Sequence, residues 1–170
     1  MERVHTCCFT GGRPEHIGFD KTDIYQFGAL KRDLEGAIRR AAAQGYTDFL
    51  CGMSRGFDLW SGETLLALSE ELGLRLHAVI PFPEQTEHWA ISDVVLYDAI
   101  LQKCTEKHMC SDAYCRGVYY ERNRYMVDRS SLVITWNLGR PGGGTDYTCR
   151  YARKNNVPII NLADPQFSLF

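Results

Sequence analysis

Residues 131–162 read SLVITWNLGRPGGGTDYTCRYARKNNVPIINL and carry the clearest fold signal in the chain. Two short apolar runs, 131–136 and 158–162, predict buried strands because they are rich in β-branched side chains. Between them, a glycine-rich loop leads into a helix predicted over 145–155. A strand, a helix and a second strand in this order predict a crossover between parallel strands.

The same alternation fills the rest of the chain. Further strands are predicted over 4–10, 48–53 and 74–80, and helices over 27–43, 58–72, 92–104 and 119–129. Such alternation specifies a mainly parallel sheet with helices on both faces, and right-handed crossovers make it doubly wound. We therefore expect a single Rossmann-like α/β domain over residues 1–170.

The composition is that of a globular domain, with 45% hydrophobic and 24% charged residues among 170. The sequence has no run of about 18 apolar residues and no apolar leader after Met1, so we expect a cytoplasmic protein with no membrane partner. There are 19 basic and 21 acidic residues, which give a formal net charge of −2. This balance disfavours nucleic acid as a partner, because phosphate backbones select a basic surplus.

The seven cysteines are scattered, and without an export signal we expect them to be free thiols. Cys104, His108, Cys110 and Cys115 lie close together, which leaves a zinc site as an alternative. They lack the paired C-x-x-C spacing of strong zinc motifs, so we expect no metal. Within 104–118, the stretch 104–115 has poor periodicity. We expect it to be mobile, with amides that exchange quickly until a ligand binds; whether it forms a lid stays open.

Ligands of doubly wound sheets bind at the carboxyl ends of the strands, and three glycine-bearing loops are predicted there. The first loop, after the strand over 4–10, offers Thr10, Gly11, Gly12 and Arg13. The glycines let a ligand approach the backbone, and the arginine provides paired donors for phosphate. A plain turn with a surface arginine is the alternative.

The second loop, CGMSRGFD at 51–58, precedes a helix whose N-terminal N–H groups favour an anion. Its candidate ligand-binding residues are Gly52, Met53, Ser54, Gly56 and Asp58. A carboxylate repels phosphate, so we expect Asp58 to bind ribose hydroxyls, with helix capping as the alternative.

The third loop, NLGRPGGGT at 137–145, gives the strongest indication of function. Consecutive glycines are costly in an ordinary loop, whereas a phosphate close to Gly142, Gly143 and Gly144 explains them, with the Thr145 hydroxyl completing the site. From the helix over 119–129, Arg122 and Asn123 are candidates to reach the same edge, and a solvated helix face is the equal alternative.

Four segments resemble, in order, sequence blocks of the YpsA-like family of the SLOG superfamily, which also holds DprA and the LOG phosphoribohydrolases: FTGGRP, CGMSRGFDLWSGE, ERNRYMVDRSSLVITW and GRPGGGTDYTCRYARKNNVPIINL. The resemblance spans 9–162 and implies a Rossmann-like fold, a ligand such as ADP-ribose or NAD, and a homodimer. By this likeness Gly52, Gly56 and Asp58 match the family's glycine-and-acid loop, and 142–145 match its phosphate loop. The family's first motif commonly reads FTGHRP, so Gly12 stands where a histidine is usual and the role of that imidazole does not transfer.

Three function classes follow. The first, which we expect, is a non-catalytic sensor, regulator or sequestering protein for a nucleotide-derived small molecule, with no certain cofactor. Its candidates for stacking on a base are Phe57, Trp60, Phe82 and Trp89, with core packing as the alternative for most of them.

The second class is an N-glycoside hydrolase, because the third loop resembles the PGGxGTxxE loop of LOG enzymes. Here Thr148 stands at the glutamate position and cannot supply a carboxylate, which leaves Asp58, Asp146 and Glu63 as weaker candidates. The third class is single-stranded DNA binding, because 52–58 resembles the DprA loop SGxAxGID. The near-neutral charge disfavours this third class.

Overall fold

The structure is a computed structural model that describes residues 1–167. In that part of the chain, one parallel sheet contains β1 (Thr6–Gly11), β2 (Asp48–Cys51), β3 (Arg75–Ile80), β4 (Glu106–Met109), β5 (Leu132–Trp136) and β6 (Ile159–Asn161). The α-helices are α1 (Ile24–Ala43), α2 (Phe57–Leu72), α3 (Ile91–Lys103), α4 (Val118–Asp128) and α5 (Gly144–Lys154). The predicted α/β class and the parallel sheet are confirmed.

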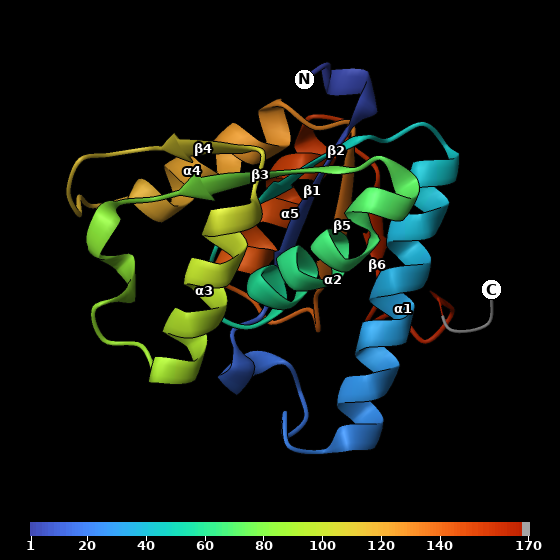
Figure 1. Cartoon of the computed structure of the whole chain (residues 1–170), viewed down its shortest axis with the longest axis horizontal. Helices are drawn as coiled ribbons and strands as arrows, with labels where there is room; N and C mark the ends of the chain where they lie inside the picture. The colour runs from blue at the N-terminus through green and yellow to red at the C-terminus, as the bar shows by residue number, and fades with distance from the viewer. Residues whose placement is uncertain (168–170) are drawn as a thin grey trace.

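The strand order is β4-β3-β2-β1-β5-β6 (Figure 1). From β1 the chain builds the sheet to one side through β2, β3 and β4, and it then adds β5 and β6 on the other side of β1. The order therefore reverses between β1 and β5, which pair from Cys7–Leu132 to Gly11–Trp136. In open α/β sheets this reversal opens a crevice at the carboxyl ends of the two strands.

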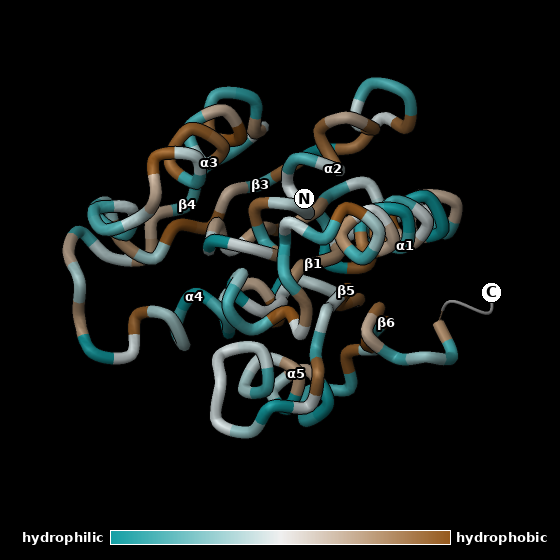
Figure 2. Tube along the Cα trace, turned by 90° about the horizontal axis from the view of Figure 1, so that it is seen from below, coloured by the Kyte–Doolittle hydropathy of each residue, from teal (hydrophilic) through white to brown (hydrophobic). Residues whose placement is uncertain are grey.

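The helices form a layer on each face of the sheet (Figure 2). Neighbouring strand residues point to opposite faces, so Cys7 and Phe9 join one core cluster and Cys8 joins the other. The first cluster contains apolar residues of α1, α2 and α3, and the second contains those of α4 and α5. Both faces of the central strands are buried, which explains their nearly continuous apolar runs.

Every predicted strand and helix is present, with small shifts at the ends. The helix predicted from residue 27 begins at Ile24, because the Asp23 carboxylate caps it by accepting the N–H groups of Tyr25 and Gln26. Ile24 and Tyr25 are 75% and 82% exposed, so the apolar periodicity missed this first turn. The first strand begins at Thr6 because a 3-10 turn, Arg3–His5, precedes it.

The prediction missed β4, which lies inside the stretch 104–115 that was expected to be mobile throughout. β4 is an edge strand that pairs only with β3 among the described strands, from His77–Glu106 to Ile80–Met109. Its burial pattern is mostly exposed, so it has no apolar run that would reveal it. Polar side chains are usual on edge strands because they discourage pairing with other chains.

No helix within residues 1–167 is long and apolar enough to span a membrane.

Candidate functional site

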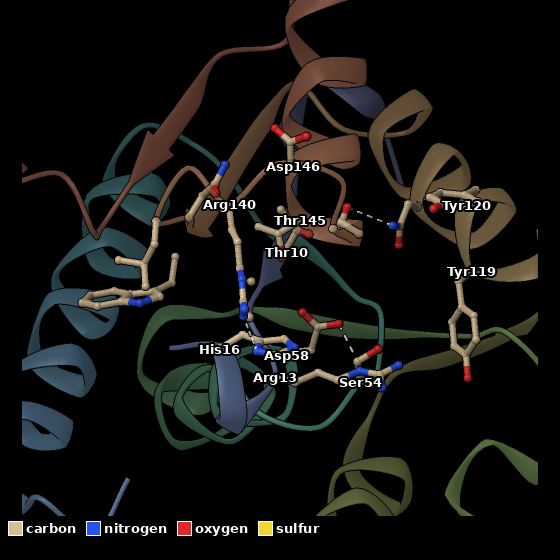
Figure 3. A pocket seen from close by; sticks show the side chains of 18 of the residues that line it. Thr10, Arg13, His16, Ser54, Asp58, Tyr119, Tyr120, Arg140, Thr145 and Asp146 are labelled. Atoms are coloured by element: carbon tan, nitrogen blue, oxygen red, sulfur yellow. Dashed lines mark hydrogen bonds between the residues drawn. The ribbon is translucent and has the colours of Figure 1, made fainter. Parts of the chain in front are cut away.

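A cavity of about 390 Å³ opens at the carboxyl ends of β1 and β5, where the strand order reverses. Its walls come from the loops after β1, β2 and β5 and from the first turns of α4 and α5 (Figure 3). Its lining residues are Thr10, Gly11, Gly12, Arg13, His16, Ser54, Asp58, Tyr119, Tyr120, Arg122, Asn123, Trp136, Asn137, Leu138, Arg140, Gly143, Gly144, Thr145 and Asp146.

Most of the predicted ligand-binding residues line this cavity. The structure brings together Thr10, Gly11, Gly12, Arg13, Ser54, Asp58, Arg122, Asn123, Gly143, Gly144 and Thr145. The loops around Gly11 and Gly143 are thus neighbours in space although 132 residues separate them in the numbering. Four predicted residues lie outside the lining: Gly52, Met53, Gly56 and Gly142.

Four of the predicted glycines meet protein atoms rather than open space: Gly11, Gly12, Gly52 and Gly56. A Cβ on Gly12 would lie 3.0 Å from the His16 carbonyl oxygen. A Cβ on Gly11 would lie 2.4 Å from the Phe57 ring, and one on Gly52 would lie 2.8 Å from the Asp58 carboxylate. Gly56 has a φ of +84°, and its Cβ would lie 2.6 Å from the Gly12 carbonyl oxygen. These glycines allow the loops and α2 to pack closely, and ligand contacts of Gly52 and Gly56, which lie outside the cavity lining, stay a prediction.

Met53 also lies outside the lining of the cavity. Its side chain is fully buried in the core, and its backbone has a φ of 57°, so the residue turns the chain between β2 and α2. Gly142 has a φ of +80° and shapes the turn before α5 without reaching the cavity.

Gly143 and Gly144 differ from the other site glycines because the space beside them is open. A Cβ on Gly143 would meet nothing within 4 Å, and one on Gly144 would meet only the Asn123 amide nitrogen, at 3.8 Å. Gly143 caps the N-terminus of α5 with an ordinary extended backbone, φ −84° and ψ 166°. Neither packing nor a left-handed backbone within the described chain therefore requires glycine at 143.

Asp58 lies at the floor of the cavity and is 4% exposed. Its Oδ2 accepts the Ser54 N–H at 3.3 Å, whereas its Oδ1 has no hydrogen-bond partner among the described residues. Burial raises the pKa of Asp58 to about 6, against the opposite effects of Arg122, the Ser54 N–H and Arg13. The floor of the cavity thus holds an acceptor that no described residue uses.

Arg122 is buried beside Asp58 and ties α4 to the loop after β2. Its guanidinium donates to the Gly52 carbonyl oxygen and, at 3.0 Å, to the Ser54 hydroxyl. Its Nε donates to the Asn123 side-chain oxygen at 2.9 Å, and the Asn123 amide donates to the Gly144 carbonyl at 3.5 Å. Arg122 and Asn123 therefore lie at the cavity and not on a solvated helix face. Their hydrogen bonds connect α4 to the loop after β2 and to the start of α5.

Two further arginines border the cavity. The guanidinium of Arg13 makes no hydrogen bond or ion pair to any residue in the described range. Arg140 reaches from the loop after β5 to the β1 side, where it donates to His16 Nδ1 at 2.6 Å (Figure 3). In this contact the His16 Nδ1 is an acceptor, so it carries no proton.

Several lining residues were not predicted: His16, Tyr119, Tyr120, Trp136, Asn137, Leu138 and Arg140. Trp136 and Asn137 follow β5 directly, so the rule that ligands bind at the carboxyl ends of strands would have found them. Trp136 Nε1 donates to the Ile17 carbonyl at 2.9 Å, and the Asn137 backbone is held by two 2.9 Å bonds to the Asn161 side chain. No sequence signal pointed to His16.

Two of the three candidate catalytic carboxylates line the cavity, and the third does not. Asp58 and Asp146 line the cavity, and Asp146 Oδ2 accepts the Gly142 N–H at 3.3 Å. Glu63 lies outside it and pairs with Lys31 at 2.7 Å. Thr148, at the position of the LOG-type glutamate, is buried, and its hydroxyl donates to the Gly144 carbonyl at 2.8 Å.

None of the four stacking candidates lines the cavity. Phe57 and Trp60 are core residues, as the alternative for most of these aromatics had it. Phe82 and Trp89 line a neighbouring groove instead. Tyr119 and Tyr120 are the aromatic residues at the cavity from α4.

The zinc alternative finds no support in the geometry. Within residues 1–167, no three histidine, cysteine or acidic side chains gather in a way that would hold a metal ion. The His108 ring instead stacks on Tyr125, with ring centroids 3.9 Å apart. The cysteines of the described chain are all free thiols, and Cys7, Cys8, Cys51 and Cys149 are buried.

Comparisons with known proteins identify sequence relatives. The YpsA family model, described as the YspA SLOG family, matches residues 7–162. A UPF0398 protein of Bacillus velezensis is 24% identical over 160 residues, which cover 90% of this chain and 88% of the relative. A UPF0398 protein of Bacillus pumilus is 25% identical over 161 residues, with 90% and 84% covered.

One solved structure is similar in fold. DNA processing protein A (DprA) from Streptococcus pneumoniae superposes with a TM-score of 0.57 and 15% sequence identity. The match covers 92% of this chain and 49% of the DprA chain, so the chain spans about half the length of that protein. At this identity the likeness shows the shared fold alone.

Proposed function

The chain belongs to the YpsA family of SLOG proteins, and we propose that it binds a nucleotide or a nucleotide-derived small molecule, such as ADP-ribose, in the cavity between β1 and β5. In this proposal the protein is a sensor, a regulator or a sequestering protein and does not alter the ligand. The volume of about 390 Å³ is within the range of small-molecule pockets.

The observation that carries the proposal is the open space beside Gly143 and Gly144. These residues begin α5, and the N–H groups of a helix's first turn have no partner within the helix. With no Cβ in the way, phosphate oxygens approach these N–H groups, and the positive end of the helix dipole favours them. The uncommitted Arg13 guanidinium supplies a further donor at the rim.

Asp58 supports the sugar part of the proposal. Its unpaired Oδ1 is a buried acceptor, and leaving such an atom without a donor is unfavourable. A ribose hydroxyl would supply the missing hydrogen once the carboxylate turns this buried oxygen toward the cavity, whereas a phosphate would be repelled. The ligand would therefore lie with its phosphate toward α5 and its ribose toward Asp58.

The first experiment is native mass spectrometry of the freshly purified protein, which would reveal a co-purified nucleotide. Calorimetry with AMP, ADP-ribose, NAD and cyclic nucleotides then measures affinity. We expect Gly143→Leu to weaken the tightest of these ligands by at least about tenfold, since its side chain would fill the phosphate position. Its folding stability should change little, because nothing in the described chain lies within 4 Å of the new Cβ.

Gly28→Leu is the matched control, because Gly28 lies on α1, away from the cavity, and its Cβ would meet only the Arg32 side chain, at 3.5 Å. Arg13→Gln should weaken ligand binding, because it removes the guanidinium at the rim of the cavity. Arg153→Gln, in the last turn of α5, is its control. Unchanged affinity in Gly143→Leu, or no heat with any of these nucleotides, would remove the basis of the proposal.

A second candidate is hydrolysis of an N-glycosidic bond, which one observation favours. Asp58 lines the cavity and its pKa is raised to about 6 by burial, as suits a general acid or base near neutral pH. Release of free base from nucleoside monophosphates, lost in Asp58→Asn, would establish this function. The commitment of the Thr148 hydroxyl to the Gly144 carbonyl argues against it.

We also propose a cytoplasmic location and a homodimer. The free cysteines of the described chain fit a reducing compartment. Light scattering after gel filtration measures the oligomeric state, and a monomer at micromolar concentration would contradict the second part.

A further inference from the structure

A second hollow adjoins the cavity, on the side of α4 and the loop after β3. This base groove, as we call it, has a volume of about 570 Å³ and is lined by Arg13, Arg55, Phe82, Glu84, Gln85, Glu87, His88, Trp89, Tyr114 and Tyr119. Arg13 and Tyr119 line both hollows. The two hollows are therefore neighbours that share a boundary at these two side chains.

The base groove has an aromatic wall. The Phe82 ring packs edge-on against Tyr114 and Tyr119, with ring centroids 5.4 Å and 5.7 Å away. Tyr114 is 66% exposed and makes no hydrogen bond through its hydroxyl within residues 1–167. Tyr119 is half-buried and Phe82 is buried. Tyrosine rings at a ligand cavity offer flat faces on which a planar group stacks.

The charges of the base groove differ from those of the cavity. Glu84 and Glu87 are exposed there, and their carboxylates repel phosphate while accepting amino groups. Arg55 is already paired with Glu15 at 2.6 Å and lies 3.8 Å from Asp93. The uncommitted guanidinium of this region is that of Arg13, at the junction with the cavity.

We propose that the aromatic base of the nucleotide lies in the base groove, stacked on Tyr114 and Tyr119, while the sugar and phosphate occupy the cavity. Arg13 then contacts the ligand where the two parts join. This inference rests on the proposed function and adds the position and chemistry of the base. In this inference the base groove, and not the glycine loops, selects a planar base that carries an amino group.

Calorimetry with paired probes tests the inference. Ribose 5-phosphate has no base, whereas AMP and ADP-ribose carry adenine on a sugar phosphate. We expect wild-type protein to bind the better of the two adenine ligands at least about tenfold more tightly than ribose 5-phosphate. Tyr114→Ala should remove most of this advantage and leave the affinity for ribose 5-phosphate unchanged.

Two variants serve as controls. Tyr114→Phe keeps the ring and should retain the adenine affinity within about twofold, since stacking needs only the flat face. Tyr25→Ala removes a ring that is 82% exposed on α1 and should change nothing. Tyr114 is itself well exposed, so its replacement does not disturb the core.

The outcomes separate the two proposals. If Gly143→Leu abolishes adenine-ligand binding but Tyr114→Ala has no effect, the base lies elsewhere and only this inference fails. If the wild-type protein binds neither ribose 5-phosphate nor an adenine ligand, the proposed function fails and this inference fails with it.

Discussion

Asp58 is an acidic side chain that folding removes from water without giving it a full set of partners. Because burial raises its pKa from 3.8 to about 6, the folded state binds its proton more tightly than the unfolded chain does. The stability from this proton is complete below pH 3.8 and is lost as the pH rises through about 6. The loss amounts to about 3 kcal/mol between these limits.

Asp58→Asn should therefore gain stability relative to the wild type as the pH rises from 4 to 7, because an amide pays no penalty for ionising. Urea unfolding of both proteins at each pH measures the difference in free energy of unfolding. Asp112→Asn, at an exposed position, is the control. A difference that stays constant across this range would show that Asp58 titrates normally.

Gly56 has no side chain, which allows the loop after β2 to pack directly against the loop after β1 at Gly12. Gly56→Ala should destabilise the protein by about 3 kcal/mol, since it combines a left-handed backbone with a clash against the Gly12 carbonyl. The midpoint of urea unfolding measures the change. Gly36→Ala on α1 is the counterpart, because its Cβ would meet only the Arg40 guanidinium, 3.7 Å away. That change should be neutral or slightly stabilising, and equal effects of the two would refute this account.

The segment between α3 and α4 contains two parts that differ in hydrogen bonding and exposure. Its first part is held to β3 by the N–H groups of Thr105, Cys110 and Ser111, which donate to Leu76, Ile80 and Pro81. The following loop, 112–117, carries Tyr114 over the base groove and is mostly exposed. We therefore expect the mobility predicted for the whole of 104–115 only at its end.

Hydrogen exchange should divide this segment near Ser111. Amides of β4 should exchange slowly, and those of 112–117 should exchange quickly until an adenine ligand is added, because ordering Tyr114 slows opening of the loop. Mass spectrometry of peptic fragments with and without ADP-ribose reads both effects. Fast exchange throughout β4 would mean that the edge strand does not form stably.

Across the whole molecule, the two ends of the sheet serve different purposes. Asp48, at the amino end of β2, accepts from Arg75 at 2.8 and 2.7 Å and bonds His77 at 2.7 Å. Burial alone would raise the pKa of Asp48, but the hydrogen bonds from Arg75 and His77 hold it far below its ordinary value. This ion pair fastens β2 to β3 at the edge opposite the cavity.

Asp48→Ala should cost about 3 kcal/mol of stability, because it removes the carboxylate that bonds the buried His77 Nε2 and the Arg75 guanidinium. Ligand affinity should be unchanged, since the residue lies at the other end of the strands. Urea unfolding measures the first effect and calorimetry with ADP-ribose the second. A loss of affinity together with intact folding would show that the two ends of the sheet are coupled.

Local patterns were sufficient to predict most of the architecture. Apolar runs, helical periodicity and glycine breaks are signals within about ten neighbouring residues, and they gave ten strands and helices in the right order. The alternation of these elements dictates a parallel sheet, and a parallel sheet places the strand-ending loops at one edge. Arg13, Asp58 and Gly143 were therefore predicted to share one site, and all three line the same cavity.

Long-range packing decided the rest. Whether a glycine faces a guest or a neighbouring side chain depends on residues far away in the sequence: Gly52 is closed off by Arg122, and Gly143 is left open. The contact between His16 and Arg140, the pairing of polar β4 with β3 and the meeting of Tyr119 with Phe82 have no local signature either. Each arises because the order of strands, fixed by the burial of both sheet faces, brings distant loops into contact.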